Sequence, residues 1–173
     1  MIKLILANPV FDKHVVDEIT AYNFQLGLLY IATYVESHGY KSKLIVGDRL
    51  VIEIIKILEG NRECLLVGFY VSADNLGEVN RICASIKNIS PSHKIILGGP
   101  EARARYLELL DSHLCDFVCI GDGEDCVLML LRILQNGEYE KLREVPNLAY
   151  KNSNKIVKTR QTYERDLDKF PIP

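Results

Sequence analysis

Short apolar runs rich in β-branched residues alternate with stretches of helical periodicity along most of the sequence. Runs in which nearly every residue is apolar are typical of strands that are buried on both faces, as in a parallel sheet covered by helices. The runs are Ile2–Ala7, Lys41–Val46, Cys64–Tyr70, Lys94–Leu97 and Cys115–Ile120. The helical patterns that follow them are Phe24–His38, Leu50–Leu58, Gly77–Ile89, Ala102–Leu110 and Glu124–Gln135.

This alternation predicts an α/β domain with a doubly wound parallel sheet, because short connections between strand and helix return each helix across the sheet. Five strands favour the flavodoxin-like (Rossmann-like) order 2-1-3-4-5 over the six-stranded dinucleotide-binding order. Turn residues stand where the predicted elements end: Asn8-Pro9 closes the first strand, and Gly39 follows the first helix. We therefore expect a five-stranded sheet with helices on both faces.

The pattern changes after Asn136-Gly137. Residues 138–145 are highly charged, and two extended pieces, Asn147–Tyr150 and Lys155–Lys158, then flank an Asn/Ser turn. This arrangement is typical of a β-hairpin. Residues 166–173 contain two prolines and have the character of a linker. We expect an α/β domain over residues 1–137, with a C-terminal hairpin and linker over 138–173 that lead toward a further domain.

Composition narrows the range of partners. A net charge of −2 argues against a nucleic-acid partner, which needs a positive surface. No uncharged run reaches the ~20 residues that a membrane-spanning helix requires, and the longest one, Ile19–Val35, contains several polar side chains. The five cysteines are spread through apolar segments, which favours reduced thiols over a disulfide framework. These features predict a cytoplasmic protein without a membrane span.

Four loops are expected to meet at the carboxyl ends of the strands, where open parallel sheets bind their ligands. The loops offer glycines, backbone amides and a serine hydroxyl, but almost no lysine or arginine, and no phosphate-binding Gly-x-x-x-x-Gly-Lys-Ser/Thr motif occurs. A large, mostly neutral ligand rich in amides fits this composition. Alternatively, the glycines only permit tight turns between strand and helix. The loops are Asn8-Pro9-Val10, Val71-Ser72-Ala73-Asp74, Gly98-Gly99-Pro100-Glu101 and Gly121-Asp122-Gly123-Glu124.

Several short motifs follow one another in a fixed order along the chain. They are Gly27-Leu28-Leu29-Tyr30-Ile31-Ala32 with Gly39-Tyr40, Leu97-Gly98-Gly99-Pro100, Asp116-Phe117-Val118 with Gly121-Asp122-Gly123-Glu124, and Val145-Pro146-Asn147-Leu148-Ala149-Tyr150. This series resembles the N-terminal cobalamin-binding domain of cobalamin-dependent radical S-adenosylmethionine (radical SAM) enzymes. The final residues, 166–173, are similar to the linker that precedes the catalytic barrel of that family. The resemblance covers nearly the whole chain.

The resemblance implies a role for each loop. The corrin ring would lie over the ends of the strands, and its nucleotide tail would run beside the sheet near the later loops. Glu124 would accept a hydrogen bond from a corrin amide, although an acidic residue in the first turn of a helix also interacts favourably with the helix dipole. The other implied contacts are Asn8, Pro9 and Gly27 on the corrin side, and Ser72, Ala73, Gly98, Gly99, Pro100, Gly121 and Gly123 beside the tail.

No metal ligand is expected in this chain. The tripeptide Asp12-Lys13-His14 matches only the start of the Asp-x-His-x-x-Gly motif by which other cobalamin domains supply a histidine to cobalt, and Asp17 stands where the glycine belongs. A loop role for His14 is therefore the better interpretation. Cys115 and Cys119 are expected on one face of a strand, ~13 Å apart, which is too far to share a cluster.

The resembling family's Cys-x3-Cys-x2-Cys motif is absent from the sequence. S-adenosylmethionine and a [4Fe-4S] cluster are accordingly expected only in a further domain, a radical SAM barrel downstream in the same polypeptide. The predicted function is to hold cobalamin for a methyltransferase or a ring-rearranging enzyme, and this part alone is not expected to be catalytic.

Two alternatives remain open. In the first, the domain has lost the cofactor and serves as a scaffold that docks a substrate or a partner. In the second, it is a stand-alone flavin or signalling module of the flavodoxin-like type. No aromatic pair that would stack on a flavin is evident, and Asn8-Pro9 occupies the place of a receiver domain's acidic cluster.

Overall fold

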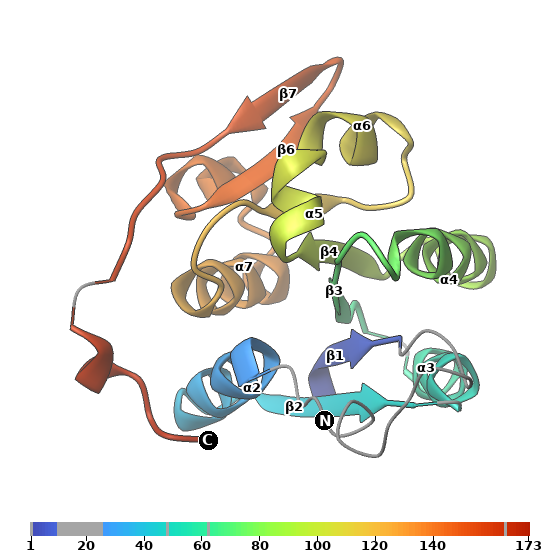
Figure 1. Ribbon diagram of the computed structural model, residues 1–173, viewed down its shortest axis with the longest axis horizontal. Helices are drawn as coiled ribbons and strands as arrows, with labels where there is room; N and C mark the ends of the chain where they lie inside the picture. The colour runs from blue at the N-terminus through green and yellow to red at the C-terminus, as the bar shows by residue number, and fades with distance from the viewer. Residues whose placement is uncertain (1, 10–25, 48, 62, 165) are drawn as a thin grey trace.

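A single sheet organises the part of the chain that the computed structural model describes, which is residues 2–9, 26–47, 49–61, 63–164 and 166–173. Among these residues the sheet has seven strands in the order β2-β1-β3-β4-β5-β6-β7 (Figure 1). Strands β1 to β5 are parallel to one another, β6 pairs antiparallel with β5, and β7 pairs antiparallel with β6. The strands are β1 (Ile2–Asn8), β2 (Lys41–Val46), β3 (Leu66–Tyr70), β4 (Lys94–Gly98), β5 (Phe117–Cys119), β6 (Leu148–Asn152) and β7 (Lys155–Lys158).

Helices cover both faces of the sheet. On one face lie α2 (Leu26–Ser37) and α7 (Glu124–Asn136). On the other lie α3 (Leu50–Glu59), α4 (Leu76–Ile89), α5 (Pro100–Ala104) and α6 (Tyr106–Asp111). The predicted doubly wound sheet with the order 2-1-3-4-5 is confirmed. No described helix is both long enough and apolar enough to cross a bilayer.

The two helix layers explain why both faces of the strands are apolar. In β1, Ile5 and Ala7 point into the core beneath α3 and α4, whereas Leu4 and Leu6 point into the core beneath α2 and α7. All four side chains are almost completely buried. Burying a leucine or isoleucine side chain contributes roughly 1.5–3 kcal/mol, so a strand with two apolar faces is strongly held at the centre of the sheet.

The C-terminal hairpin extends the same sheet. Strand β6 pairs antiparallel with β5, so that Cys119 lies opposite Leu148 and Phe117 lies opposite Tyr150. The 3-10 turn η1 (Tyr139–Glu144) leads into the hairpin, and a second one, η2 (Leu167–Lys169), follows it. Leu148 and Tyr150 are buried in the core that α2 and α7 cover. The expected boundary after residue 137 stays a prediction.

One predicted helix is broken in the structure. The expected helix Ala102–Leu110 is replaced by α5 and α6, which meet at Arg105, whose φ of −113° and ψ of 22° are not helical. The Arg105 carbonyl still accepts the first hydrogen bond of α6, from the amide of Leu109, and its guanidinium bonds to Glu108. Ala102 and Leu109 both lie in the core despite the break, as they would on one face of an unbroken helix.

The prediction that Cys115 and Cys119 share one face of a strand was wrong. Strand β5 begins only at Phe117, so Cys115 precedes it and the two-residue period does not apply. Cys115 packs in the core beneath α4 and α6, whereas Cys119 packs on the opposite side with Cys126. All five cysteines are free thiols, and within the described residues no three His, Cys, Asp or Glu side chains cluster as a metal site would require.

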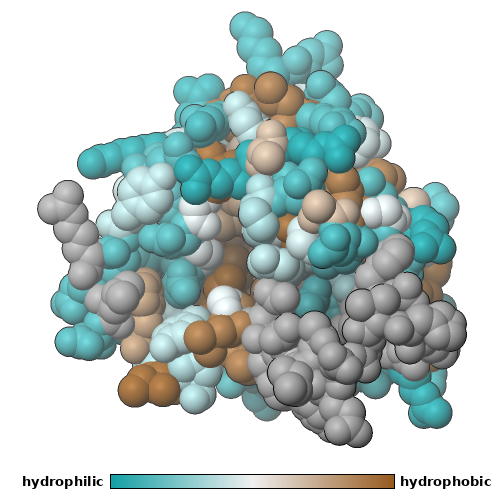
Figure 2. Space-filling model, in the orientation of Figure 1, coloured by the Kyte–Doolittle hydropathy of each residue, from teal (hydrophilic) through white to brown (hydrophobic). Residues whose placement is uncertain are grey.

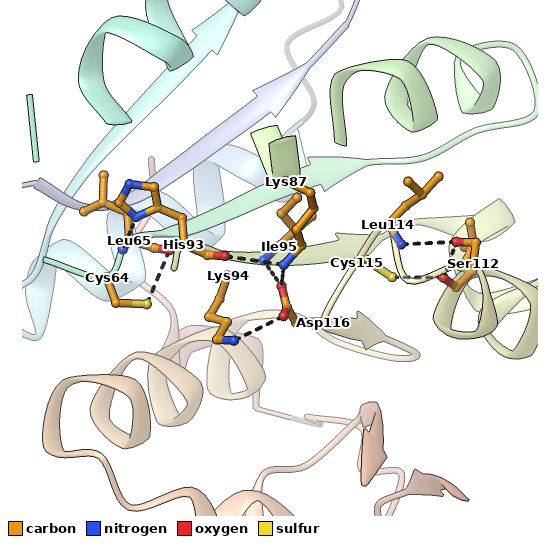
Figure 3. Close-up of polar contacts among 11 residues, drawn as sticks. Cys64, Leu65, Lys87, His93, Lys94, Ile95, Ser112, Leu114, Cys115 and Asp116 are labelled. Carbon is orange, nitrogen blue, oxygen red and sulfur yellow. Dashed lines mark hydrogen bonds and ion pairs between the residues drawn. The ribbon is translucent and has the colours of Figure 1, made fainter. Parts of the chain in front are cut away.

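A polar cluster fastens the sheet at the amino ends of β3 and β4 (Figure 3). The Asp116 carboxylate accepts a 2.8 Å hydrogen bond from the amide of Ile95 and forms ion pairs with Lys87 and Lys94. His93 is 1% exposed, and its Nδ1 accepts a hydrogen bond from the amide of Leu65. Asp116 belongs to a motif that carries the family resemblance, and its role here is to hold the chain before β5 against β4.

Candidate functional site

A groove lies between the sheet and the two helices α2 and α7, at the carboxyl ends of the central strands. Its volume is about 290 Å³, close to the lower end of the ~300–1,000 Å³ that is usual for small-molecule sites. In Figure 2, brown hydrophobic atoms lie at the bottom of a hollow between the positions that α2 and α7 occupy in Figure 1. The side chains of Leu6, Ile96 and Cys119 contribute to its floor, and those of Leu28, Ile31 and Val127 to its walls.

Two positions on the floor of the groove are glycines. Gly68 and Gly98 stand where larger side chains of β3 and β4 would otherwise fill the space. A Cβ at Gly98 would meet only the Cβ of Cys119, at 3.7 Å, so this position opens freely into the groove. A Cβ at Gly68 would lie 2.8 Å from Cδ2 of Leu6. Gly98 therefore leaves open space in the floor, whereas the space beside Gly68 is taken by the side chain of Leu6.

Gly99 is required for its backbone conformation rather than for the space in the groove. Its φ of 101° and ψ of 175° lie in a region essentially restricted to glycine. A Cβ at this position would lie 2.6 Å from the carbonyl oxygen of Val71. That carbonyl also accepts a hydrogen bond from the amide of Glu101, and the amide of Val71 donates to the Gly98 carbonyl at 2.7 Å. Gly99 thus permits the loops after β3 and β4 to lie directly against each other.

The loop Gly121-Asp122-Gly123-Glu124 closes one end of the groove at the start of α7. A Cβ at Gly123 would lie 2.6 Å from Cδ1 of Ile31, so the loop lies directly against α2. A Cβ at Gly121 would lie 2.6 Å from the side chain of Asn147. A side chain at either position would have to displace Ile31 or Asn147, so the two glycines let this loop pack closely between a helix and the hairpin.

Glu124 brings a half-buried carboxyl group to the groove. Burial is the largest effect on its pKa, which is raised above the usual glutamate value, while the amides of Glu124 and Gly123 partly oppose the shift. The neighbouring carboxylate of Asp122 raises the pKa further. A carboxyl group in this setting can hydrogen-bond a neutral amide.

Asn75 organises the loop after β3, a role the sequence did not reveal. It is 4% exposed, and its Nδ2 donates to Oδ1 of Asn8 at 3.2 Å and to the Tyr70 carbonyl at 3.0 Å. Its Oδ1 accepts from the amide of Ser72 at 2.9 Å. The end of β1 is thereby tied to the loop after β3. The signal was an asparagine just before a helix, where such residues favour turns and caps.

The structure brings only part of the predicted site together. Six of the predicted residues line the groove: Gly27, Gly98, Gly99, Gly121, Gly123 and Glu124. The others lie at or just beyond the carboxyl ends of β1, β3 and β4 without lining it: Asn8, Pro9, Ser72, Ala73 and Pro100. His14 lies outside the described residues. The roles of all these residues toward a cofactor stay predictions.

Sequence reasoning also missed lining residues on the strands. Gly68, Tyr70 and Cys119 line the groove from β3 and β5. Gly68 carried a usable signal, because a glycine inside an apolar strand often marks a close approach by a ligand or a second backbone. Cys119 carried none, because a buried free cysteine behaves as a small apolar residue.

A doubly wound sheet, with an apolar groove between the strand ends and two helices, defines a cofactor-binding α/β domain of the flavodoxin-like class. The family model described as "B12 binding domain" matches residues 13–131. The chain therefore belongs to the B12-binding domain family, whose cofactor is cobalamin. No curated protein sequence matches the chain.

Solved structures share the fold over nearly the whole chain. One is the cobalamin-dependent S-adenosylmethionine radical enzyme OxsB with aqua-cobalamin and S-adenosylmethionine bound, with a TM-score of 0.78 and 17% identity over 99% of this chain. Another is the radical S-adenosylmethionine methyltransferase TsrM from Kitasatospora setae with cobalamin and a [4Fe-4S] cluster bound, with a TM-score of 0.69 and 16% identity over 95% of this chain. This chain spans only 24% and 30% of those two proteins.

Proposed function

We propose that this chain holds cobalamin for a radical SAM enzyme, with the nucleotide tail of the cofactor in the groove and the corrin ring over the ends of the strands. The observation that carries the proposal is the groove itself, whose floor is open at Gly98. Its apolar floor suits a flat aromatic base, and its rim of backbone amides and the Glu124 carboxyl suits the amide-fringed corrin. Membership of the B12-binding family supports the same cofactor.

The division of labour follows from what this chain contains. When bound, cobalamin supplies methyl-transfer or rearrangement chemistry. The residues described here position and shield it, and they include no three-cysteine cluster site. S-adenosylmethionine and the iron–sulfur cluster are proposed to belong to a radical SAM barrel in the same polypeptide. The similar structures are of proteins three to four times as long, OxsB with S-adenosylmethionine bound and TsrM with a [4Fe-4S] cluster bound.

Five free thiols favour a reducing compartment, and we place the parent enzyme in the cytoplasm. Its reaction would be a methyl transfer or a ring rearrangement. The competing proposal is a scaffold that has lost the cofactor and docks a substrate or a partner. Direct binding measurements separate the two.

The test is a titration of the purified chain with hydroxocobalamin, followed by visible spectra and calorimetry. We expect saturable binding and a spectral shift. Gly98→Leu should weaken binding more than ~10-fold, a loss of about 1.4 kcal/mol, because its side chain would fill the groove without meeting the backbone. Gly77→Leu is the matched control, because Gly77 lies on α4 and a Cβ there meets nothing within 4 Å.

Absence of binding by folded wild-type protein at high micromolar cofactor would overturn the proposal and favour the scaffold. Equal binding by the wild type and by Gly98→Leu would contradict the placement of the tail in the groove. Circular dichroism of each variant establishes that the protein is folded.

A further inference from the structure

Asn147 stands at an unusual backbone position beside the groove. It immediately precedes β6 and is 2% exposed, and its φ of 57° is left-handed. Among residues with a side chain, asparagine tolerates this region best, and glycine adopts it without strain. Glycine would therefore satisfy the backbone conformation at this position, so any further role of Asn147 lies in its side-chain amide.

That amide joins two segments that are distant in sequence. Its Nδ2 donates a 3.1 Å hydrogen bond to the carbonyl of Asp122, within the loop that closes the groove. Its Oδ1 accepts a 2.8 Å hydrogen bond from the amide of Thr162, in the segment that follows β7. Because the side chain is buried, neither bond competes with bulk water.

The backbone of Asn147 makes the same two connections. Its carbonyl accepts from the amide of Ile120 at 2.8 Å, and its amide donates to the carbonyl of Arg160 at 3.0 Å. Gly121 completes the arrangement, because any side chain there would collide with the Asn147 amide. A single residue therefore holds the start of the loop, its middle and the segment after the hairpin in one geometry.

The segment after β7 reinforces this connection. Nε2 of Gln161 donates to the Ile120 carbonyl at 2.9 Å, and the amide of Glu164 donates to Oδ2 of Asp122 at 3.2 Å. In Figure 1 this segment descends from β7 past α7 toward α2. The loop that closes the groove is thus held from the side of the hairpin and the C-terminal segment as well as by its own helix.

We propose that Asn147 is a positioning residue for the nucleotide tail of the cofactor. It fixes the loop Gly121–Glu124 at the end of the groove and couples that loop to the segment after β7. The inference rests on the proposed function for the identity of the ligand, but the coupling itself is a property of the protein without ligand.

The test is Asn147→Gly, which keeps the left-handed backbone and removes only the side-chain amide. Two lost hydrogen bonds are expected to weaken hydroxocobalamin binding about tenfold. Binding of cobinamide, which lacks the nucleotide tail, should change less than twofold. A general loss of structure would weaken both ligands alike, so the ratio of the two affinities reports positioning.

Asn147→Asp separates the two bonds. It retains an oxygen that accepts from Thr162 but has no donor for the Asp122 carbonyl. Amide exchange measured without ligand should therefore show Thr162 exposed in Asn147→Gly and still protected in Asn147→Asp, with residues 120–127 more exchangeable in both variants. Ser153→Gly is the matched control, because Ser153 has a φ of 53° in the β6–β7 turn, away from the groove.

Unchanged exchange of residues 120–127 and of Thr162 in Asn147→Gly would overturn the proposed coupling, whatever the protein binds. Faster exchange with an unchanged ratio of cobalamin to cobinamide affinity would overturn the role toward the tail. Failure of the wild type to bind hydroxocobalamin would instead overturn the proposed function, and the exchange measurement would still decide the coupling.

Discussion

The two adjacent glycines at the end of β4 are required for different physical reasons. Gly98 borders open space in the groove, whereas Gly99 adopts backbone angles that other residues avoid and abuts the Val71 carbonyl. The sequence presents them as one Gly-Gly motif, and the family resemblance implied that both lie beside the nucleotide tail of the ligand. Only the backbone angles and the neighbouring strand distinguish a glycine that makes room from a glycine that makes a turn.

This distinction predicts different stabilities. Gly99→Ala should lower the free energy of unfolding by about 2–4 kcal/mol, because it combines backbone strain with a collision against a carbonyl oxygen. Gly98→Ala should leave it within about 1 kcal/mol of the wild type, because the added Cβ makes an ordinary contact. Urea denaturation of both variants measures the difference. Equal losses at the two positions would contradict the assignment.

Two asparagines whose roles the sequence did not reveal have partners that lie far along the chain. Asn75 bonds to Asn8, 67 residues away, and Asn147 bonds to Asp122, 25 residues away. Each is an ordinary turn asparagine when seen with its neighbours in sequence. The glycine loops were predictable because the topology alone brings the ends of parallel strands to one edge.

At the level of helices and strands, periodicity predicted most of the fold. The parallel strands and their order were predicted because strands buried on both faces leave a continuous apolar signature. The break at Arg105 was not, because Ala102, Leu109 and Leu110 fit an unbroken helix as well as a bent one. The hairpin was predicted, but its pairing with β5 was not, since antiparallel pairing on the edge of the sheet depends on space rather than on local pattern.

His93 makes the stability of the sheet dependent on pH. Its Nδ1 accepts from the Leu65 amide, so the proton lies on Nε2, which faces the Leu58 carbonyl at 3.4 Å. Only the bond from the Leu65 amide requires the neutral ring. Burial is the largest effect and lowers the pKa below the ordinary 6.5, while the bond to the Leu58 carbonyl partly opposes the shift. Nearby Lys87 also lowers the pKa.

The sign of the pH effect follows directly. Below pH 6.5 the unfolded chain takes up a proton on this histidine, whereas the folded protein resists protonation until a lower pH. The stabilising contribution is therefore complete above pH 6.5 and is lost as the pH falls below it. Urea denaturation between pH 8 and pH 5 should show a steeper decline for the wild type than for His93→Gln. Parallel curves would rule out His93 as the titrating group.

At the level of the whole molecule, the hairpin contributes to the core beneath α2 and α7 and also covers the edge of β5. Leu142, Val145, Leu148 and Tyr150 are buried in the cluster that α2 and α7 cover. A chain that ends at Gly137 would lose these contacts and leave the edge of β5 unpaired, which favours association between molecules.

We therefore expect the truncation at Gly137 to unfold with low cooperativity or to associate, as measured by urea denaturation and size-exclusion chromatography. A chain that ends at Tyr163 retains the hairpin and the Thr162 contact with Asn147, and it should remain a cooperative monomer. A monomeric, cooperatively folding 1–137 fragment would instead establish that the five-stranded unit is autonomous.

The C-terminal segment also fastens the two walls of the groove to each other. Asp125 on α7 accepts a hydrogen bond from the Tyr34 hydroxyl on α2 and pairs with Lys169, while Phe170 packs edge-on against the Tyr34 ring. A ligand held between α2 and α7 would dissociate only when these contacts open. None of these residues lies on the floor of the groove. We expect them to affect the dissociation rate of a ligand more than its affinity.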